Sequence, residues 1–158
     1  MTKSFVHLHA HTEYSMLDGA AKIVDYLKKV KELNQPAAAI TDHGNLYGAM
    51  EFVQKANDFG IKPIIGYEAY LTPGSRFDRP DRDKNKRYHL TLLAENNIGY
   101  QNLVEIVSKA YLEGFYYKPR VDYELLREHA EGIIALSGCL GGEVAQHLAP
   151  DGSREEGN

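Results

Sequence analysis

Three histidines near the start of the chain alternate with small or apolar residues in the run His7-Leu8-His9-Ala10-His11. In an extended strand, this alternation would send all three imidazoles to one face. Imidazole is the commonest metal-ligating side chain near neutral pH, so two of them at this spacing can hold one cation or bridge a pair. Surface histidines and an expression tag are the alternatives, but the interleaved apolar residues argue against a tag.

Hydrophobic periodicity predicts that strands alternate with helices along the chain. Strands are expected at 5–9, 37–40, 61–71, 88–94 and 132–137, and helices at 20–33, 46–59, 100–112, 123–129 and 143–148. Segments 72–86 and 114–121 are expected to be loops, because the first is polar with prolines and the second is aromatic and basic. The alternation favours parallel pairing with right-handed crossovers, and ligands in such folds gather at the carboxyl ends of the strands.

Residues able to bind a metal accompany each predicted strand. In strand order they are His9 and His11, then His43, Glu68, His89 and Cys139. Because the carboxyl ends of parallel strands meet at one rim, we expect these side chains to face a common site. Glu68 is the most informative of them, because a carboxylate within an apolar strand is costly to bury without a metal or a basic partner.

Several of these residues also have simpler explanations. His43 lies in an Asp-His-Gly-Asn sequence of turn composition and could serve a turn or a helix cap. His89 alone would fit a hydrogen-bonded core histidine, and Cys139 alone would fit a small buried hydrophobic residue. Asp18 could be a metal ligand or the N-cap of the first helix. For His7 we expect a buried structural imidazole.

A mixed set of imidazole, carboxylate and thiolate ligands suits zinc, manganese or iron better than magnesium or calcium. The set is also larger than one tetrahedral ion can use, so it predicts a cluster of several ions. Such clusters polarise a phosphoryl oxygen and generate hydroxide at neutral pH. The residues therefore favour hydrolysis of a phosphoester.

Composition places further bounds on the protein. The 158 residues suffice for one domain with its own core, and the 43% hydrophobic and 25% charged content is ordinary for a globular protein. A net charge of −4 argues against a module that wraps nucleic acid, so any DNA contact would be local. The single cysteine suits a reducing cytosol, and no apolar run is long enough to cross a membrane. We expect a cytoplasmic protein without membrane contact.

Three segments resemble the PHP (polymerase and histidinol phosphatase) family: HLHAHTEYSMLDG at 7–19, GFYYKPRVD at 114–122 and SGCLGGE at 137–143. The middle segment is typical of the polymerases, so the chain is most similar to the N-terminal PHP domain of bacterial DNA polymerase III alpha subunits. The resemblance implies an α/β fold, a distorted TIM-like barrel of seven βα units, of which about five are present here. We expect a partial PHP domain over 1–149 and a polar tail over 150–158, where the chain is truncated.

The resemblance also implies a metal centre of up to three divalent ions. The ligand positions of the family correspond to His9, His11, Asp18, His43, Glu68, His89 and Cys139. All seven are intact, which favours the metal-binding class over the family members whose ligands are degraded. The family pattern ends with an Asp-x-His motif on a late strand, and this sequence has no such motif.

Three functions are consistent with the resemblance. In the first, the domain is a phosphoesterase that removes mispaired 3′ ends by 3′–5′ exonuclease (proofreading) activity. Lys118 and Arg120 would then contact phosphate or DNA, unless their loop packs between domains. In the second, the domain is a non-catalytic, metal-stabilised scaffold. It would bind the remainder of the polymerase chain and replisome subunits such as a proofreading exonuclease subunit, with DNA bound through the full-length protein. The third is a free-standing histidinol-phosphatase-like enzyme, which the segment 114–122 argues against.

Overall fold

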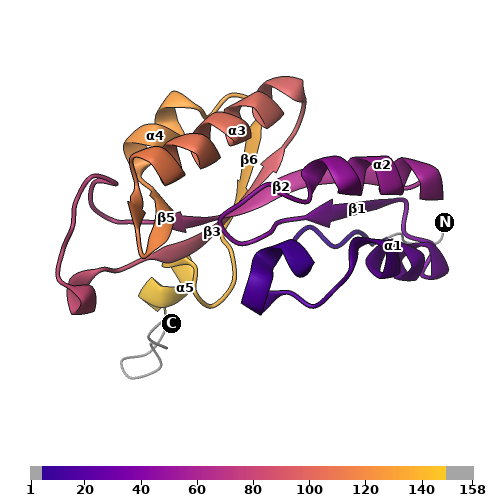
Figure 1. The fold of residues 1–158 in the computed structure, drawn as a ribbon, viewed down its shortest axis with the longest axis horizontal. Helices are drawn as coiled ribbons and strands as arrows, with labels where there is room; N and C mark the ends of the chain where they lie inside the picture. Colours follow the sequence, from indigo (N-terminus) through magenta and orange to yellow (C-terminus); the bar gives the residue numbers. More distant parts are fainter. Residues whose placement is uncertain (1–4, 149–158) are drawn as a thin grey trace.

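The computed structural model describes residues 5–148, apart from the side chains of Leu17 and Asp83, as a mixed α/β fold (Figure 1). In chain order its elements are η1 (Glu13–Asp18), α1 (Ile23–Glu32), β1 (Ala37–Ile40), α2 (Ala49–Phe59), β2 (Lys62–Leu71), η2 (Arg82–Lys84), β3 (Tyr88–Ala94), α3 (Asn97–Leu112), β4 (Phe115–Tyr116), β5 (Lys118–Val121), α4 (Tyr123–Glu128), β6 (Ile133–Leu136) and α5 (Glu143–Leu148). The predicted polar tail, 150–158, lies outside the described residues.

The long strand β2 organises a six-stranded sheet of order β4-β5-β2-β3-β6, in which β1 also pairs with β2. One edge of β2 binds β1 in parallel near Ile65 and β5 in parallel at Tyr70 and Leu71. The other edge pairs antiparallel with β3, which in turn pairs antiparallel with β6. Uniform parallel pairing is therefore a wrong prediction. The sheet formed by residues 5–148 is open, in agreement with the expected partial barrel.

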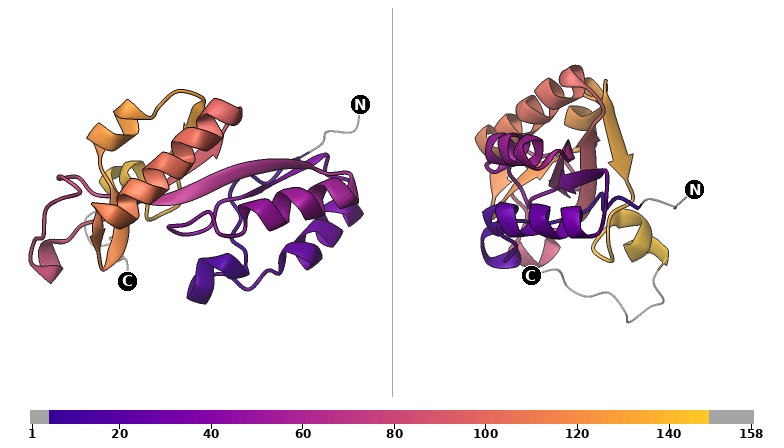
Figure 2. Two further views of the ribbon diagram at one scale, coloured as in Figure 1. Left: turned by 45° about the horizontal axis from the view of Figure 1, so that its top comes forward. Right: turned by 90° about the vertical axis from the view of Figure 1, so that its right-hand side faces the viewer.

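Two hydrophobic clusters pack at the two ends of β2. One lies between α1, α2 and β1 and includes Leu27, Ile40 and Phe52, all at most 2% exposed. The other lies between β2, β3, β5, α3 and α4 and includes Tyr67 and Leu103. Figure 2 shows α1 beside α2 in one half of the molecule and α3 in the other. The middle of β2 thus joins two separately packed halves.

Local sequence explains where several helices begin and end. α2 ends at Gly60, whose φ of 70° favours glycine because it has no Cβ. α3 begins after Asn96 and α4 begins after Asp122, and each of these N-cap side chains accepts a hydrogen bond from a backbone N–H in the first turn. The predicted bounds are correct for 143–148, whereas α1 and α2 begin three residues later than expected and α3 begins three residues earlier.

Three predictions about strands are wrong. Residues 5–9 form no strand; the chain instead approaches β1 just beyond them, where the Thr41 N–H donates to the Ala10 carbonyl at 2.8 Å. Segment 114–121 is a hairpin of β4 and β5 rather than a loop, with Tyr117 at its tip at a φ of 62°. β6 is present but is not buried, because Ile134 on this sheet edge is 46% exposed.

Among the helices of residues 5–148, none has the length and apolar character to span a membrane.

Candidate metal centre

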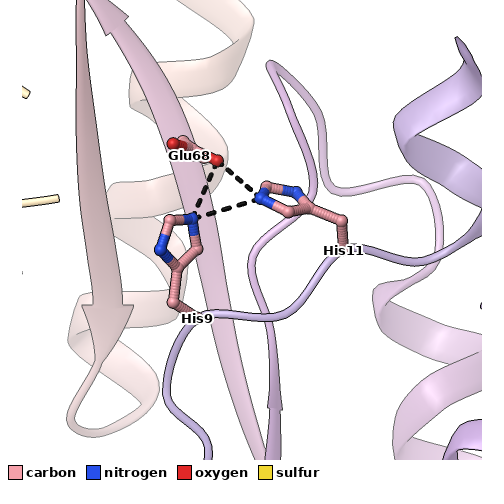
Figure 3. Close-up of side chains that lie close together, drawn as sticks. All are labelled: His9, His11 and Glu68. Atoms are coloured by element: carbon pink, nitrogen blue, oxygen red, sulfur yellow. Dashed lines mark hydrogen bonds and ion pairs between the residues drawn. The ribbon is translucent and has the colours of Figure 1, made fainter. Parts of the chain in front are cut away.

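Glu68 lies in the middle of β2 with 1% of its side chain exposed, and two imidazoles approach one of its carboxylate oxygens (Figure 3). Its Oε2 is 3.0 Å from Nε2 of His9 and 2.9 Å from Nε2 of His11. The two imidazole nitrogens are themselves 3.2 Å apart. Three potential ligand atoms from two distant parts of the chain therefore meet at one point.

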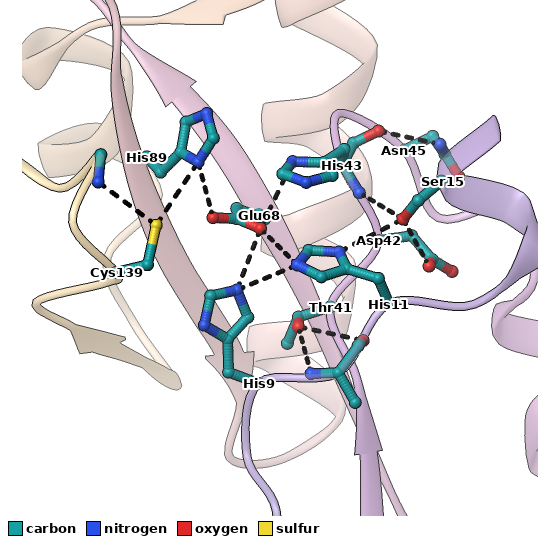
Figure 4. A network of polar contacts seen from close by, with 12 residues as sticks. His9, His11, Ser15, Thr41, Asp42, His43, Asn45, Glu68, His89 and Cys139 are labelled. Atoms are coloured by element: carbon teal, nitrogen blue, oxygen red, sulfur yellow. Dashed lines mark hydrogen bonds and ion pairs between the residues drawn. The ribbon is translucent and has the colours of Figure 1, made fainter. Parts of the chain in front are cut away.

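Two further histidines complete a ring around the same carboxylate (Figure 4). Nδ1 of His43 is 3.3 Å from Oε2 of Glu68, and Nδ1 of His89 is 3.0 Å from its Oε1. The rings of His11 and His43 stack with centroids 4.1 Å apart. Two groups could each hold an ion, His9–His11–Glu68 and His43–Glu68–His89, because the ligand atoms in each lie within 4.8 Å of one another.

The fold brings these side chains together through backbone pairing. An isolated parallel bridge joins His43 to Glu68: the Gly44 N–H donates to the Glu68 carbonyl, and the Glu68 N–H donates to the Asp42 carbonyl. His89 stands near the start of β3, so it reaches the site from the amino end of an antiparallel strand. The expectation that every ligand lies at a carboxyl end is wrong for this residue.

A buried aspartate that sequence reasoning missed anchors the histidine segment. Asp42 is 2% exposed and accepts hydrogen bonds from the backbone N–H of Thr12 at 2.6 Å, from its hydroxyl at 2.8 Å and from the hydroxyl of Ser15 at 2.8 Å. The Ser15 oxygen lies 3.3 Å from Nδ1 of His11 and accepts from the backbone N–H of His43 at 3.0 Å. The available signal was the position of Asp42 directly before His43.

The remaining two predicted ligands lie at the periphery. Asp18 is exposed at the end of η1. Its charge still acts on the cluster's neighbour Tyr70, because burial together with the charges of Asp18 and Glu68 raises the pKa of Tyr70 to about 12. Cys139 is exposed, with its sulfur 3.7 Å from Nδ1 of His89. Neither belongs to the two compact groups of the described residues. Their role as ligands stays a prediction.

The ionisation of the cluster follows from burial and mutual contact. Burial alone would raise the pKa of Glu68, but the close contacts with His11, His89 and His9 hold it well below its usual range. Burial lowers the pKa of His43, whereas the hydrogen bond to Glu68 raises the pKa of His9. The cluster therefore combines an ionised carboxylate with at least one histidine that favours its neutral, metal-binding form.

Two buried atoms of the cluster lack hydrogen bonds, namely Nδ1 of His43 and Oε1 of Glu68. Nδ1 of His43 lies 3.3 Å from Oε2 of Glu68, and Oε1 of Glu68 lies 3.0 Å from Nδ1 of His89, but both are ion-pair contacts without hydrogen-bond geometry. Buried polar atoms are nearly always hydrogen-bonded, so each unsatisfied one calls for an explanation. A divalent cation would use both, and the donor set of four imidazoles and one carboxylate fits zinc, manganese or iron.

The two predicted basic contacts have different environments. The Lys118 ammonium lies 5.2 Å from the ring centre of Tyr70, which itself packs against His43 and His89. Lys118 is therefore beside the cluster. Arg120 is 0% exposed and donates to backbone carbonyls within the chain, so its side chain is held inside the domain. Its contact with phosphate, DNA or another domain stays a prediction.

The three other histidines lie outside this ring. His7 is exposed, with its ring edge-on to Phe5 at a centroid distance of 4.8 Å, so the expected buried imidazole is wrong. His129 follows α4, and its Nε2 lies 3.1 Å from the ammonium of Lys109. His147 belongs to α5 and is exposed. Four of the seven histidines thus gather around Glu68.

Comparison with known proteins gives three findings. The model of the PHP domain family matches residues 7–157. DNA polymerase III subunit alpha of Thermus aquaticus is 61% identical over 152 residues (93% of this chain, 12% of that protein), and the Deinococcus radiodurans protein is 55% identical over 154 residues (92% and 12%). A solved candidate metal-dependent phosphoesterase of Bifidobacterium adolescentis aligns with a TM-score of 0.48 and 17% identity, over 68% of this chain and 33% of that one. The chain thus spans about 12% of the length of these curated relatives.

Proposed function

Because this chain belongs to the PHP domain family, we propose that the cluster around Glu68 binds divalent metal ions and hydrolyses a phosphoester. The observation that carries the proposal is the convergence of four histidines on one buried carboxylate. Two potential ligand atoms of this cluster, Nδ1 of His43 and Oε1 of Glu68, are left without hydrogen bonds. A structural ion pair would have no need of four imidazoles. Zinc, manganese or iron, up to three ions, is the proposed occupant, with Asp18 and Cys139 as the outer ligands.

Each part of the chain has a separate task in this proposal. Bound ions would polarise a phosphoryl oxygen and lower the pKa of bound water. Glu68 stays ionised and so offsets the positive charge of the ions. Ser15, held by Asp42, positions the ring of His11 and the backbone of His43. Lys118 adds a cation beside the cluster that can attract the phosphate of a substrate.

The polymerase relatives support a narrower substrate. We propose that the domain is part of a DNA polymerase III alpha subunit and removes nucleotides from mispaired 3′ ends of DNA. The 55–61% identity to such subunits supports this assignment. In this proposal the rest of the polymerase chain and other replisome subunits are partners, DNA is bound by the full-length protein, and the protein works in the cytoplasm.

The test combines metal analysis with an exonuclease assay on the complete protein. We expect bound divalent metal and release of 3′ nucleotides from mispaired ends, both strongly reduced in Glu68→Gln. Glu95→Gln is the matched control, because Glu95 is exposed and lies outside the cluster. Equal activity of Glu68→Gln and its control would contradict the proposed catalysis.

The same experiment separates the alternatives. If bound metal stabilises the fold but no nucleotides are released from 3′ DNA ends, the result would support a scaffold in place of an exonuclease. Hydrolysis of histidinol phosphate that disappears in Glu68→Gln, with no effect on DNA ends, would instead support the small-molecule phosphatase.

A further inference from the structure

A second collection of polar groups lies beyond the end of β2, where segment 72–86 folds against the β4–β5 hairpin. A cavity of about 450 Å³ opens there. Its wall includes Arg79, Lys84, Asn85, Lys86 and Arg120, and none of its residues belongs to the ring around Glu68. In Figure 1 the η2 segment of this wall projects at the opposite end of the molecule from α1.

Arg120 brings a buried positive charge to this cavity. Its guanidinium donates to the backbone carbonyls of Gly114 at 3.0 Å, Arg76 at 2.9 Å and Asp78 at 2.6 Å, and to Oδ1 of Asn85 at 3.4 Å. Among the side chains that the structure describes, no carboxylate oxygen lies within 4.0 Å of it. Buried charges are normally paired directly with an opposite charge, whereas the partners of this guanidinium are carbonyl oxygens.

Asn85 supplies a second, independent indication. The side chain is 8% exposed, and its Nδ2 is buried without a hydrogen-bond partner. Because a guanidinium can only donate, the contact with Arg120 fixes the amide oxygen toward that residue. The amide N–H₂ must then point elsewhere, and it is a donor without an acceptor in the wall of a cavity.

The other charges around the cavity add to the positive potential. Residues 76–87 contain six arginines or lysines and three aspartates, a net charge of +3 in a chain whose total is −4. Asp78 is the acidic residue in the wall, and its Oδ2 accepts from the backbone N–H of Ser75. Arg79 donates to backbone carbonyls, including that of Glu113, and these do not neutralise its charge.

We propose that this cavity binds a phosphate group. Phosphate oxygens only accept hydrogen bonds and carry negative charge, so they match an amide N–H₂, an ammonium and a guanidinium together. The group can come from the backbone of a single DNA strand or from free pyrophosphate. Thr72 in the wall is the first residue after β2 and follows Glu68 by four residues, about 13 Å of extended chain, so a DNA strand seated here passes near the metal centre.

The experiment is hydrogen exchange of the complete protein with a chelator present, so that metal-bound phosphate does not contribute. The probes are inorganic pyrophosphate and a short oligothymidylate, used separately. We expect slower exchange in 73–87 with at least one probe. Titration of that probe should show an affinity about tenfold weaker in Asn85→Asp and in the double variant Lys84→Gln/Lys86→Gln. The matched control is Lys28→Gln/Lys29→Gln, which removes two exposed charges from α1.

The two probes identify the source of the phosphate. Protection by oligothymidylate alone assigns a DNA backbone, and protection by both probes assigns any phosphate group. A slope of log affinity against log salt that falls by roughly 1.4 in the double lysine variant supports direct phosphate contact. The proposal is overturned if neither probe protects 73–87, or if Asn85→Asp and the lysine pair bind as tightly as the α1 control. The result is independent of the exonuclease assay, because no metal ligand is changed.

Discussion

Two buried clusters of charged side chains lie within β2 and just beyond its end, and they differ in whether the chain satisfies all their hydrogen-bonding atoms. After the strand, Arg76 and Asp122 form an ion pair at 3.0 Å, and the same carboxylate accepts the backbone N–H groups of Arg76 and Leu125. Arg76 also donates to Glu113 at 2.7 Å. Within the strand, Glu68 is surrounded by imidazoles, yet one of its own oxygens has no hydrogen bond. The first cluster is satisfied by the chain itself, and the second is not.

This difference separates a structural site from a binding site. A buried ion pair is stable when further hydrogen bonds satisfy its remaining atoms, as they do around Asp122. A cluster that keeps free coordinating atoms has capacity for something outside the chain. The predictions below test whether the two clusters differ in this way.

The largest effect is expected from Asp122→Ala. It leaves the buried charge of Arg76 without its main partner and removes the N-cap of α4, so the free energy of unfolding should fall by about 3–5 kcal/mol. Urea unfolding at neutral pH measures this. The control is Glu124→Ala, whose exposed carboxylate lies 3.6 Å from Arg76. If the two variants lose similar stability, the Asp122 cluster is not the structural one.

Metal binding should stabilise the protein through the other cluster. At a free zinc or manganese concentration about 100 times the dissociation constant, the free energy of unfolding should rise by about 2.7 kcal/mol. Glu68→Gln should lose most of this gain because the carboxylate is shared by both candidate groups. Thermal unfolding with added metal and with a chelator measures it, and an unchanged transition would speak against a metal site.

Acid should weaken the Asp122 cluster. Burial raises the pKa of Asp122, but the backbone N–H groups of Arg76 and Leu125 and the charge of Arg76 lower it by more. The pKa of Asp122 therefore lies below its usual value. The folded protein therefore binds fewer protons than the unfolded chain. This stabilisation is complete above the unfolded pKa, near 4, and is lost as pH falls through the folded pKa. Asp122→Asn should show a shallower loss of stability on acidification, and an identical acid profile would contradict the assignment.

The smallest effect is expected from Ser15→Ala. The hydroxyl bridges Asp42 and the backbone of His43, and its loss should cost about 1 kcal/mol of unfolding free energy. Ser108→Ala is the control, because that exposed hydroxyl only bonds a carbonyl one turn earlier on α3. Equal stability of the two variants would show that Ser15 adds nothing to the support of the cluster.

Much of the architecture was predictable from local pattern. The apolar run 37–40 and the strand 88–94 have the predicted bounds, and α2 ends at the glycine that the sequence indicates. The hairpin at 115–121 was not predictable in this way, because its aromatic and basic composition is equally typical of a loop. Residues 5–9 have the composition of a strand, but in the folded protein the adjoining segment is held by Thr41 and Asp42.

The sequence alone determined which side chains can bind a metal, because residue type and spacing are local properties. Only the tertiary structure decided how they meet. His89 reaches Glu68 because β3 runs antiparallel, and Arg120 is buried because segment 72–86 folds over it. Both outcomes depend on contacts between residues far apart in the chain, and no local pattern encodes the direction in which two distant segments pair.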